Sequence, residues 1–362
     1  MCFMNAILQV LVYCPPFYNL FDRIGKEVRQ KMSSKTPLMD AMVMFIREFQ
    51  LLSDIAARSG HIGEKAKQIA LENIGEAFGP DNIYKSMRGN SRFNSMQRGH
   101  QEDAEEFLGF LLDGLHEEFL QSLETVTNGS VLDAVSSRAT SVDGSNDDWL
   151  EVGKKQRTAH TRSAVVTESP ISRIFGGNMR SILRIGGAKD SVTLEPYQPL
   201  QLDIQSNGVR SIMDALSQLP EPEIISEDWT NGNGMKVRAT KQVFIESLPP
   251  VLILHLKRFF WKQIGYPLIL DIPSGAVSPG RRSTLKTKYK LFGVVYHHGL
   301  SASGGHYTVD VLRQDSQSWI HLDDTSIEPV DAKDVAVEVP EVENFNTRRP
   351  DRLAYILLYA QV

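Results

Sequence analysis

The chain has 362 residues, of which 41% are hydrophobic and 23% charged, and its formal net charge is −5. This composition is typical of a globular protein with a sizeable core, and it provides no overall basic field to attract nucleic acid or anionic lipid. The two cysteines are too few for a disulfide framework or a four-cysteine zinc site, and no apolar run reaches the roughly 20 residues of a transmembrane helix.

The opening segment, "MCFMNAILQV", predicts a helix with Cys2 at its N-terminus. Apolar residues recur at three- and four-residue spacing: Phe3, Met4, Ile7, Leu8 and Leu11. The Pro-Pro pair after Cys14 should end this helix. A helix N-terminus favours a thiolate, which suits a nucleophile, whereas a small buried apolar side chain is the alternative for Cys2. A signal peptide is a poorer interpretation of residues 2–14, because no basic residue precedes Arg23.

Helical patterns continue through the first 120 residues. Two further helices are predicted over 37–52 and 101–123, where apolar residues follow helical spacing. From 125 to 168 the chain is polar and rich in Ser, Thr, Gly and Asp without a sustained period, which predicts a disordered insertion within the domain. Residues 219–234 are a shorter break of the same kind.

The rest of the chain has the pattern of strands. "RIFGGNMRSILRI" suggests two strands joined at Gly176-Gly177, and "PPVLILHLKRFFW" has the continuous apolar run of a strand buried on both faces. Further strands are expected in "EPYQPLQLDI", "YKLFGVVYHH", "HYTVDVL", "SWIHLDD" and "LAYILLYA". Helices followed by strands predict an α+β fold with an antiparallel sheet.

A nucleophilic thiol needs a base, usually histidine, and a third group that orients the imidazole ring. Of the nine histidines, His297, His298 and His306 flank "GLSASGG", a loop whose glycines would let another chain approach closely. His255 lies in the most apolar strand, where a hydrogen-bonded core histidine is expected.

The segment after that loop predicts a hairpin centred at 314–315. In that register Val309 faces Ile320 and His306 faces Asp323. Directly opposed side chains have Cβ atoms about 5 Å apart, so imidazole and carboxylate could meet beside the glycine-rich loop. A surface pair of little energetic value is the alternative, and a one-residue slip would separate the two groups.

At these residues the chain resembles the ubiquitin-specific proteases, thiol hydrolases that remove ubiquitin from proteins. "CFMNAILQVL" is similar to the family's cysteine box, and "YHHGLSASGGHYTVDV" with "WIHLDDTSI" is similar to its histidine box. "GHQEDAEEFLGFLL" resembles the helix between them, and "LPPVLILHLKRF" resembles a palm strand. The resemblance spans nearly the whole chain and implies one catalytic domain over 1–362, with the papain-like right-hand fold of a helical thumb and β fingers and palm.

The resemblance also implies a role for each catalytic group. Cys2 is expected to be the nucleophile, His306 the general base and Asp323 its orienting partner, with Asp324 as an acid that assists or replaces it. Attack by the thiolate on the last carbonyl of ubiquitin's tail would give an acyl-enzyme that water hydrolyses.

Further residues are expected, by the same resemblance, to hold the C-terminal tail of ubiquitin. They are Gln101, Asp103 and Glu106 on the helix, and Gly304, Gly305 and Tyr307 beside the glycine-rich loop. A carboxylate on the helix could pair with an arginine of the tail, and a tail ending in two glycines lets the enzyme close tightly round the scissile bond.

The chain departs from the family pattern in three places. Only Met1 precedes Cys2, so we expect an N-terminally truncated domain. It would lack the asparagine with which family members stabilise the oxyanion, and loss of one such donor lowers the rate about 10²–10³-fold. "ILRIGGAKDS" stands where many members have the first of two Cys-x-x-Cys pairs, so neither zinc nor another cofactor is expected. "RFFWKQIGYPLIL" is a shorter connection between palm strands than the family pattern suggests.

The leading hypothesis is a deubiquitinating thiol hydrolase that cleaves the (iso)peptide bond after ubiquitin's C-terminal glycine. Two alternatives remain: a ubiquitin-binding pseudoenzyme or weakly active fragment, and a cysteine protease that acts on ordinary peptides. The expected partners are ubiquitin and ubiquitylated proteins, with no nucleic acid and no membrane. We expect a monomer in the cytoplasm and also in the nucleus.

Overall fold

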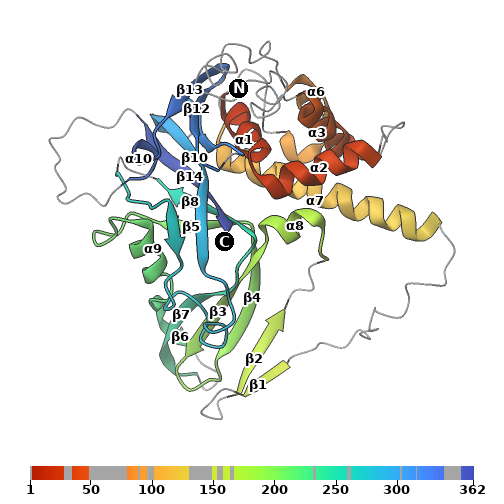
Figure 1. The fold of residues 1–362 in the computed structure, drawn as a ribbon. Helices are drawn as coiled ribbons and strands as arrows, with labels where there is room; N and C mark the ends of the chain where they lie inside the picture. Colours follow the sequence, from red (N-terminus) through yellow and green to blue (C-terminus); the bar gives the residue numbers. More distant parts are fainter. Residues whose placement is uncertain are drawn as a thin grey trace.

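The computed structural model describes residues 2–27, 35–48, 80–88, 90–94, 96, 102–129, 149–152, 158–163, 167–230, 234–258, 262–301, 304–314, 316–337 and 352–362. It has the predicted α+β architecture, in which the first helices gather on one side of a long sheet while a second sheet extends away from them (Figure 1). None of the helices in these ranges is both long and apolar enough to cross a membrane.

The helical region begins with the helix that carries Cys2. Its helices are α1 (Cys2–Val12), α2 (Pro15–Glu27), α3 (Pro37–Glu48), α6 (Asp81–Met87), the 3-10 turn η1 (Ser91–Phe93) and α7 (Ala104–Gly129). The predicted end of α1 is confirmed, but Pro15 then starts α2, because the N–H that proline lacks at the first helical position would be unpaired anyway. The predicted helix over 37–52 is confirmed as far as Glu48, and residues 49–52 lie outside the described ranges.

The long sheet runs in the order β13-β12-β11-β10-β14-β8-β5, and β9 pairs with β10. Its strands are β5 (Pro199–Asp203), β8 (Val251–Lys257), β9 (Ile269–Asp271), β10 (Lys288–Ser301), β11 (Gly304–Leu312), β12 (Trp319–Asp323), β13 (Ser326–Val330) and β14 (Leu353–Gln361). The prediction of an antiparallel sheet holds for its other neighbouring pairs but is wrong for β5 and β8, which are parallel. The chain passes through the second sheet between them, and this long crossover lets both strands run in one direction.

Helix α1 lies close against the long sheet, which places Cys2 near β11 and β12. It contacts both of these strands and α7, and its residues are buried except for Asn5 and Gln9. Gly293 of β10 permits the close approach, since a Cβ atom there would lie 2.3 Å from Val10 Cγ2.

The second sheet has the order β1-β2-β4-β3-β7-β6. Its strands are β1 (Trp149–Val152), β2 (Thr158–Ser163), β3 (Gly177–Ile185), β4 (Ser191–Tyr197), β6 (Glu223–Thr230) and β7 (Lys236–Ser247), and three short helices are α8 (Pro170–Phe175), α9 (Ile212–Gln218) and α10 (Ala332–Val335). The prediction of two strands in "RIFGGNMRSILRI" is wrong, because α8 precedes the single strand β3. Ser169 and Ser172 form a capping box that starts this helix before Pro170.

Two polar segments contain regular structure that their composition did not predict. Within 125–168, α7 continues to Gly129 and β1 pairs with β2, while 130–148, 153–157 and 164–166 lie outside the described residues. A disordered insertion therefore stays a prediction for the segment as a whole. The predicted break at 219–234 is wrong for 223–230, where β6 pairs with β7 at the edge of the second sheet.

Candidate active site

The two cysteines have different surroundings. Cys2 is the first residue of α1. Burial raises the pKa of the Tyr307 hydroxyl, and the charge of Asp103 and, to a smaller extent, the nearby thiol of Cys2 raise it further. Helix α1 contacts β11 and β12, the strands that carry His306 and Asp323, so the thiol and the expected base lie on elements that pack against each other. Cys14 is fully buried between α1 and α2, and burial raises the pKa of its thiol to about 12. A thiol in that environment stays protonated and inert near neutral pH.

His306 and Asp323 form the pair that the sequence predicts. His306 Nε2 donates to Asp323 Oδ1 at 2.5 Å. The predicted register is wrong, however, because Val309 faces Leu322 and Val311 faces Ile320. Since a shift of two residues keeps every side chain on its own face of a strand, His306 and Asp323 still meet, as diagonal neighbours.

The three histidines near the glycine-rich loop differ in the groups that they contact. His297 lies 4.9 Å from the Tyr307 ring, and burial lowers its pKa, so its ring is neutral near pH 7. His298 Nε2 is hydrogen-bonded to Thr308 Oγ1 at 2.8 Å. Among the three, His306 has the carboxylate partner that a general base requires for orientation.

Asp324 does not replace Asp323 as the hydrogen-bond partner of His306. Its carboxylate accepts a hydrogen bond from Asn5 Nδ2 at 2.8 Å, and its backbone carbonyl accepts one from Gln9 Nε2 at 2.9 Å. One nitrogen of His306 and one carboxylate oxygen each of Asp323 and Asp324 nevertheless lie within 4.8 Å of one another, close enough to be ligands of one metal ion. The bonds from His306 and Asn5 account for both carboxylates, so we assign no metal role to this cluster.

The glycines beside His306 have distinct conformations. Gly305 has φ +145°, and a Cβ atom there would lie 2.2 Å from the His298 carbonyl oxygen. A residue with a side chain is thus excluded at this position. Gly304 is exposed, and the β10–β11 ladder is irregular between His298 and Ser301. Both glycines lie where the tail channel is expected, but their role in binding stays a prediction.

The expected tail-binding helix is α7, whose N-terminus is docked on the long sheet. Tyr355 Oη lies 2.8 Å from both carboxylate oxygens of Asp103, to which it donates, and the backbone N–H of Glu105 donates to Asp103 as well. Glu106 is exposed, whereas Gln101 lies outside the described residues. Asp103 therefore has an internal partner, Tyr355, which sequence analysis did not identify.

A buried histidine lies behind this helix terminus. The prediction that His255 is a core residue is confirmed, but its Nδ1 has no hydrogen-bond partner among the described residues. The nearest carboxylate oxygen, from Glu105, is 3.6 Å away, and burial lowers the pKa of His255 to about 4. Burial, followed by the charge of Asp103, raises the pKa of Glu105. His255 is therefore neutral at pH 7, and the two groups do not form an ion pair there.

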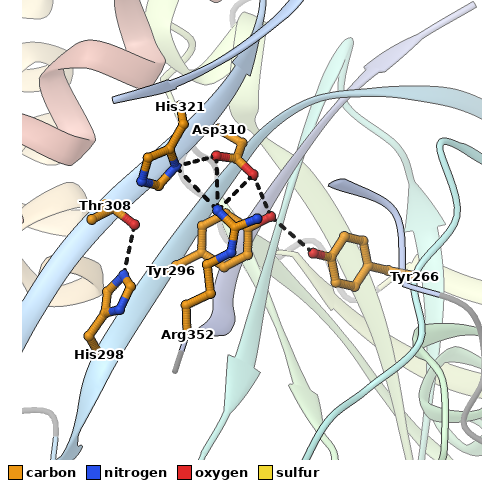
Figure 2. A network of polar contacts seen from close by, with 7 residues as sticks. All are labelled: Tyr266, Tyr296, His298, Thr308, Asp310, His321 and Arg352. Atoms are coloured by element: carbon orange, nitrogen blue, oxygen red, sulfur yellow. Dashed lines mark hydrogen bonds and ion pairs between the residues drawn. The ribbon is translucent and has the colours of Figure 1, made fainter. Parts of the chain in front are cut away.

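A polar network joins side chains of β10, β11 and β12 with Tyr266 and Arg352 (Figure 2). At its centre the fully buried Asp310 accepts hydrogen bonds from His321 Nδ1 at 2.5 Å and from Tyr296 Oη at 2.8 Å. Arg352 Nη1 lies 3.3 Å from Asp310 Oδ2, and its guanidinium carbon is 4.4 Å from the centre of the Tyr296 ring. The network shares a sheet face with His306 and Asp323, and only the unexplained acid in the apolar strand "HYTVDVL" could have indicated it.

A cysteine at the start of a buried helix, beside a histidine oriented by an aspartate, defines a cysteine-type hydrolase. The chain belongs to the ubiquitin carboxyl-terminal hydrolase family, whose model matches residues 1–359. Membership confirms the predicted class of enzyme, a cysteine-type deubiquitinating hydrolase.

Relatives support this assignment over the full length of the chain. "Probable ubiquitin carboxyl-terminal hydrolase 3" of Schizosaccharomyces pombe is 43% identical over 389 residues, which cover 99% of this chain and 72% of the relative. Ubiquitin carboxyl-terminal hydrolase 10 of Xenopus tropicalis is 36% identical over 396 residues, which cover all of this chain but 46% of the relative. The chain thus spans less than half of that second, longer protein.

A solved structure shares the fold. The SAGA Ubp8/Sgf11/Sus1/Sgf73 deubiquitinating module bound to ubiquitin aldehyde matches with a TM-score of 0.65 and 19% identity, covering 100% of this chain and 67% of the matched chain. At this low identity the match establishes the fold alone. The shared fold confirms the predicted fold class.

Proposed function

We propose that the chain cleaves the (iso)peptide bond after the C-terminal glycine of ubiquitin, with Cys2 as the nucleophile. The observation that carries this proposal is the hydrogen-bonded His306–Asp323 pair beside the helix that begins with Cys2. Family membership supports the class of reaction, and the related Ubp8 module bound to ubiquitin aldehyde supports ubiquitin as the partner.

The chemistry follows from these groups. His306 takes the proton of the Cys2 thiol, and the sulfur attacks the carbonyl carbon of the last glycine of ubiquitin. His306 then gives that proton to the departing amine as the C–N bond breaks, which leaves a thioester. Water, deprotonated by His306, attacks the thioester, releases the ubiquitin carboxylate and restores the thiol. Asp323 holds the ring in one tautomer and stabilises its cationic form.

The tail of ubiquitin would pass between α7 and the glycine-rich segment of β10 and β11. Asp103 and the exposed Glu106 offer carboxylates for a basic tail residue, and Gly305 lets β11 lie close to the His298 carbonyl of β10 beside His306. For Asp103 to bind the tail it must share its oxygens with Tyr355, or exchange Tyr355 for the new partner.

The test is labelling by ubiquitin that carries a thiol-reactive electrophile in place of its terminal carboxylate. We expect one covalent adduct with the wild-type chain and with Cys14→Ala, and none with Cys2→Ala. No adduct from a folded protein that still binds ubiquitin would favour a pseudoenzyme or a weakly active fragment. Cleavage of short peptides without dependence on folded ubiquitin would favour an ordinary cysteine protease.

A further inference from the structure

Two polar side chains of α1 bond to the turn that follows Asp323. Asn5 Nδ2 donates to the carboxylate of Asp324, and Gln9 Nε2 donates to its backbone carbonyl. The two chain segments are separated by 319 positions between Asn5 and Asp324. We propose that Asn5, Gln9 and Asp324 form a latch of positioning residues that sets the place of Cys2 relative to His306. This inference rests on the proposed function, because the proposed function gives Cys2 and His306 their catalytic roles.

The spacing on α1 supports this role. Asn5 and Gln9 follow Cys2 by three and seven positions, so the three side chains share one face of the helix. They are also the residues of α1 that are not buried, while the rest of its surface is in apolar contact. Apolar packing is non-directional, and it fixes the rotation and sliding of a helix less sharply than hydrogen bonds do.

The other half of the latch adjoins the catalytic pair. Asp323 pairs with Ser326, so Asp324 and Thr325 form a two-residue turn between β12 and β13. Asp324 has φ +48°, a left-handed conformation that aspartate and asparagine adopt more readily than most residues. This turn therefore carries two adjacent acids with different tasks: Asp323 orients the base, and Asp324 anchors the helix of the nucleophile.

The consequence for catalysis is geometric. A reacting thiol must be held close to its partner groups, and a misplacement of about 1 Å can cost roughly 10²-fold in rate. A direct electrostatic action of Asp324 on His306 is the competing explanation, because a carboxylate oxygen of Asp324 lies within 4.8 Å of a ring nitrogen of His306. The two explanations differ in whether the negative charge must be at position 324.

An exchange of the amide and the carboxylate separates them. Asn5→Asp puts two carboxylates opposite each other and breaks the latch. Asn5→Asp combined with Asp324→Asn restores an amide–carboxylate bond with donor and acceptor reversed. Asp324→Asn alone keeps an acceptor for Asn5, whereas Asp324→Ala removes it. Asparagine also tolerates the backbone conformation at position 324.

The measurements are kcat and KM on a ubiquitin-based substrate, together with the rate at which iodoacetamide alkylates Cys2 between pH 5 and 9. We expect Asn5→Asp and Asp324→Ala to lower kcat by about tenfold or more with little change in KM, and to slow alkylation. The double variant should recover most of both rates, and Asp324→Asn should retain most of both. Alkylation requires no ubiquitin, so this readout survives even if the proposed substrate is wrong.

Three results would overturn the latch. The first is an Asp324→Asn variant as impaired as Asp324→Ala with no recovery in the exchange, which would assign the charge of Asp324 directly to His306. The second is unchanged rates in all four variants. The third is a loss of rate that only follows the loss of folded protein, as measured by circular dichroism at the assay temperature.

Discussion

His306 and Asp323 are diagonal neighbours across the β11–β12 hairpin, joined by a 2.5 Å hydrogen bond rather than by direct opposition in the ladder. Thr308 occupies the position opposite Asp323 when the register of Val309 and Leu322 is continued. The carboxylate thus reaches along β11 toward the end of the strand, where His306 adjoins the glycines. Because Asp323 bonds to Nε2, Nδ1 is the ring nitrogen of His306 that would take the proton of a thiol.

Substitution of Asp323 should impair the chemical step. We expect Asp323→Ala to lower kcat by roughly 10²–10⁴-fold with little change in KM, because the imidazole then loses the acceptor that holds its tautomer and stabilises its cationic form. Steady-state kinetics on a ubiquitin-based substrate measures this. Asp331→Ala is a matched control, since Asp331 is an exposed acid paired with Lys333 and adjoins the end of β13 that lies farthest from His306 in the strand registers. Equal activity of the two variants would contradict the role of Asp323.

The two cysteines should give opposite phenotypes when replaced. Cys2→Ala should abolish turnover. Cys14→Ala should keep kcat but lower the free energy of unfolding by about 1–2 kcal/mol, because it opens a cavity at a fully buried site. Kinetics and urea unfolding of both variants provide the test. A large loss of kcat in folded Cys14→Ala would contradict the assignment of Cys14 as the inert thiol.

Acid should destabilise the fold through His255. Its pKa is lowered to about 4 by burial, from 6.5 in the unfolded chain, so the unfolded state binds the proton first as pH falls. Its contribution is fully present above about pH 6.5 and is lost between pH 6.5 and 4, amounting to about 3 kcal/mol. Glu105, whose pKa is raised, acts with the opposite sign, since its stabilisation is lost as pH rises.

Urea unfolding of the wild type and His255→Gln at a series of pH values from 4.5 to 7.5 measures this effect. The variant should be somewhat less stable at pH 7.5 and should lose less stability on acidification. Glu105→Gln serves as a separate variant to isolate the opposing contribution. Parallel pH profiles for the wild type and His255→Gln would refute the assignment.

The buried network around Asp310 should be important for stability. Arg352→Met removes a cation beside a carboxylate with no solvent exposure, and we expect a loss of about 2–3 kcal/mol. The figure lies below that for a fully buried pair because Arg352 is partly exposed and His321 and Tyr296 still donate to Asp310. Arg173→Met is the control, since its ion pair with Glu168 is exposed and should contribute under about 1 kcal/mol. Similar losses in both variants would contradict this account.

Local patterns were sufficient for most elements of the fold. The helices over 2–12 and 37–48 follow from apolar residues that repeat with the helical period, and the strands at 251–257 and 353–361 follow from continuous apolar runs, because both faces of these strands are buried. Helix α8 was not predicted, because it is short and its start depends on the capping box of Ser169 and Ser172 rather than on an apolar pattern. Strand β6 was missed because its exposed position at a sheet edge allows a polar composition.

The candidate catalytic groups could also be named from the sequence: a cysteine at a helix start, a histidine beside glycines and an aspartate across a hairpin. The register of that hairpin could not, because alternation does not distinguish a strand from its copy shifted by two residues. The turn decides it, since the N–H of Arg313 donates to the carbonyl of Ser318 and Ser316 adopts φ +58°.

Only the tertiary structure decided which polar groups become partners. Asn5 meets Asp324, Tyr355 meets Asp103, and Arg352 meets Asp310, at separations of 319, 252 and 42 positions along the chain. No local pattern encodes such pairs, because each depends on how a helix or strand packs against elements distant in sequence. The sequence by itself thus determined the reacting groups and the faces on which they lie. Packing determined what holds them in place, since burial requires each polar group to find a partner at whatever sequence distance the fold provides.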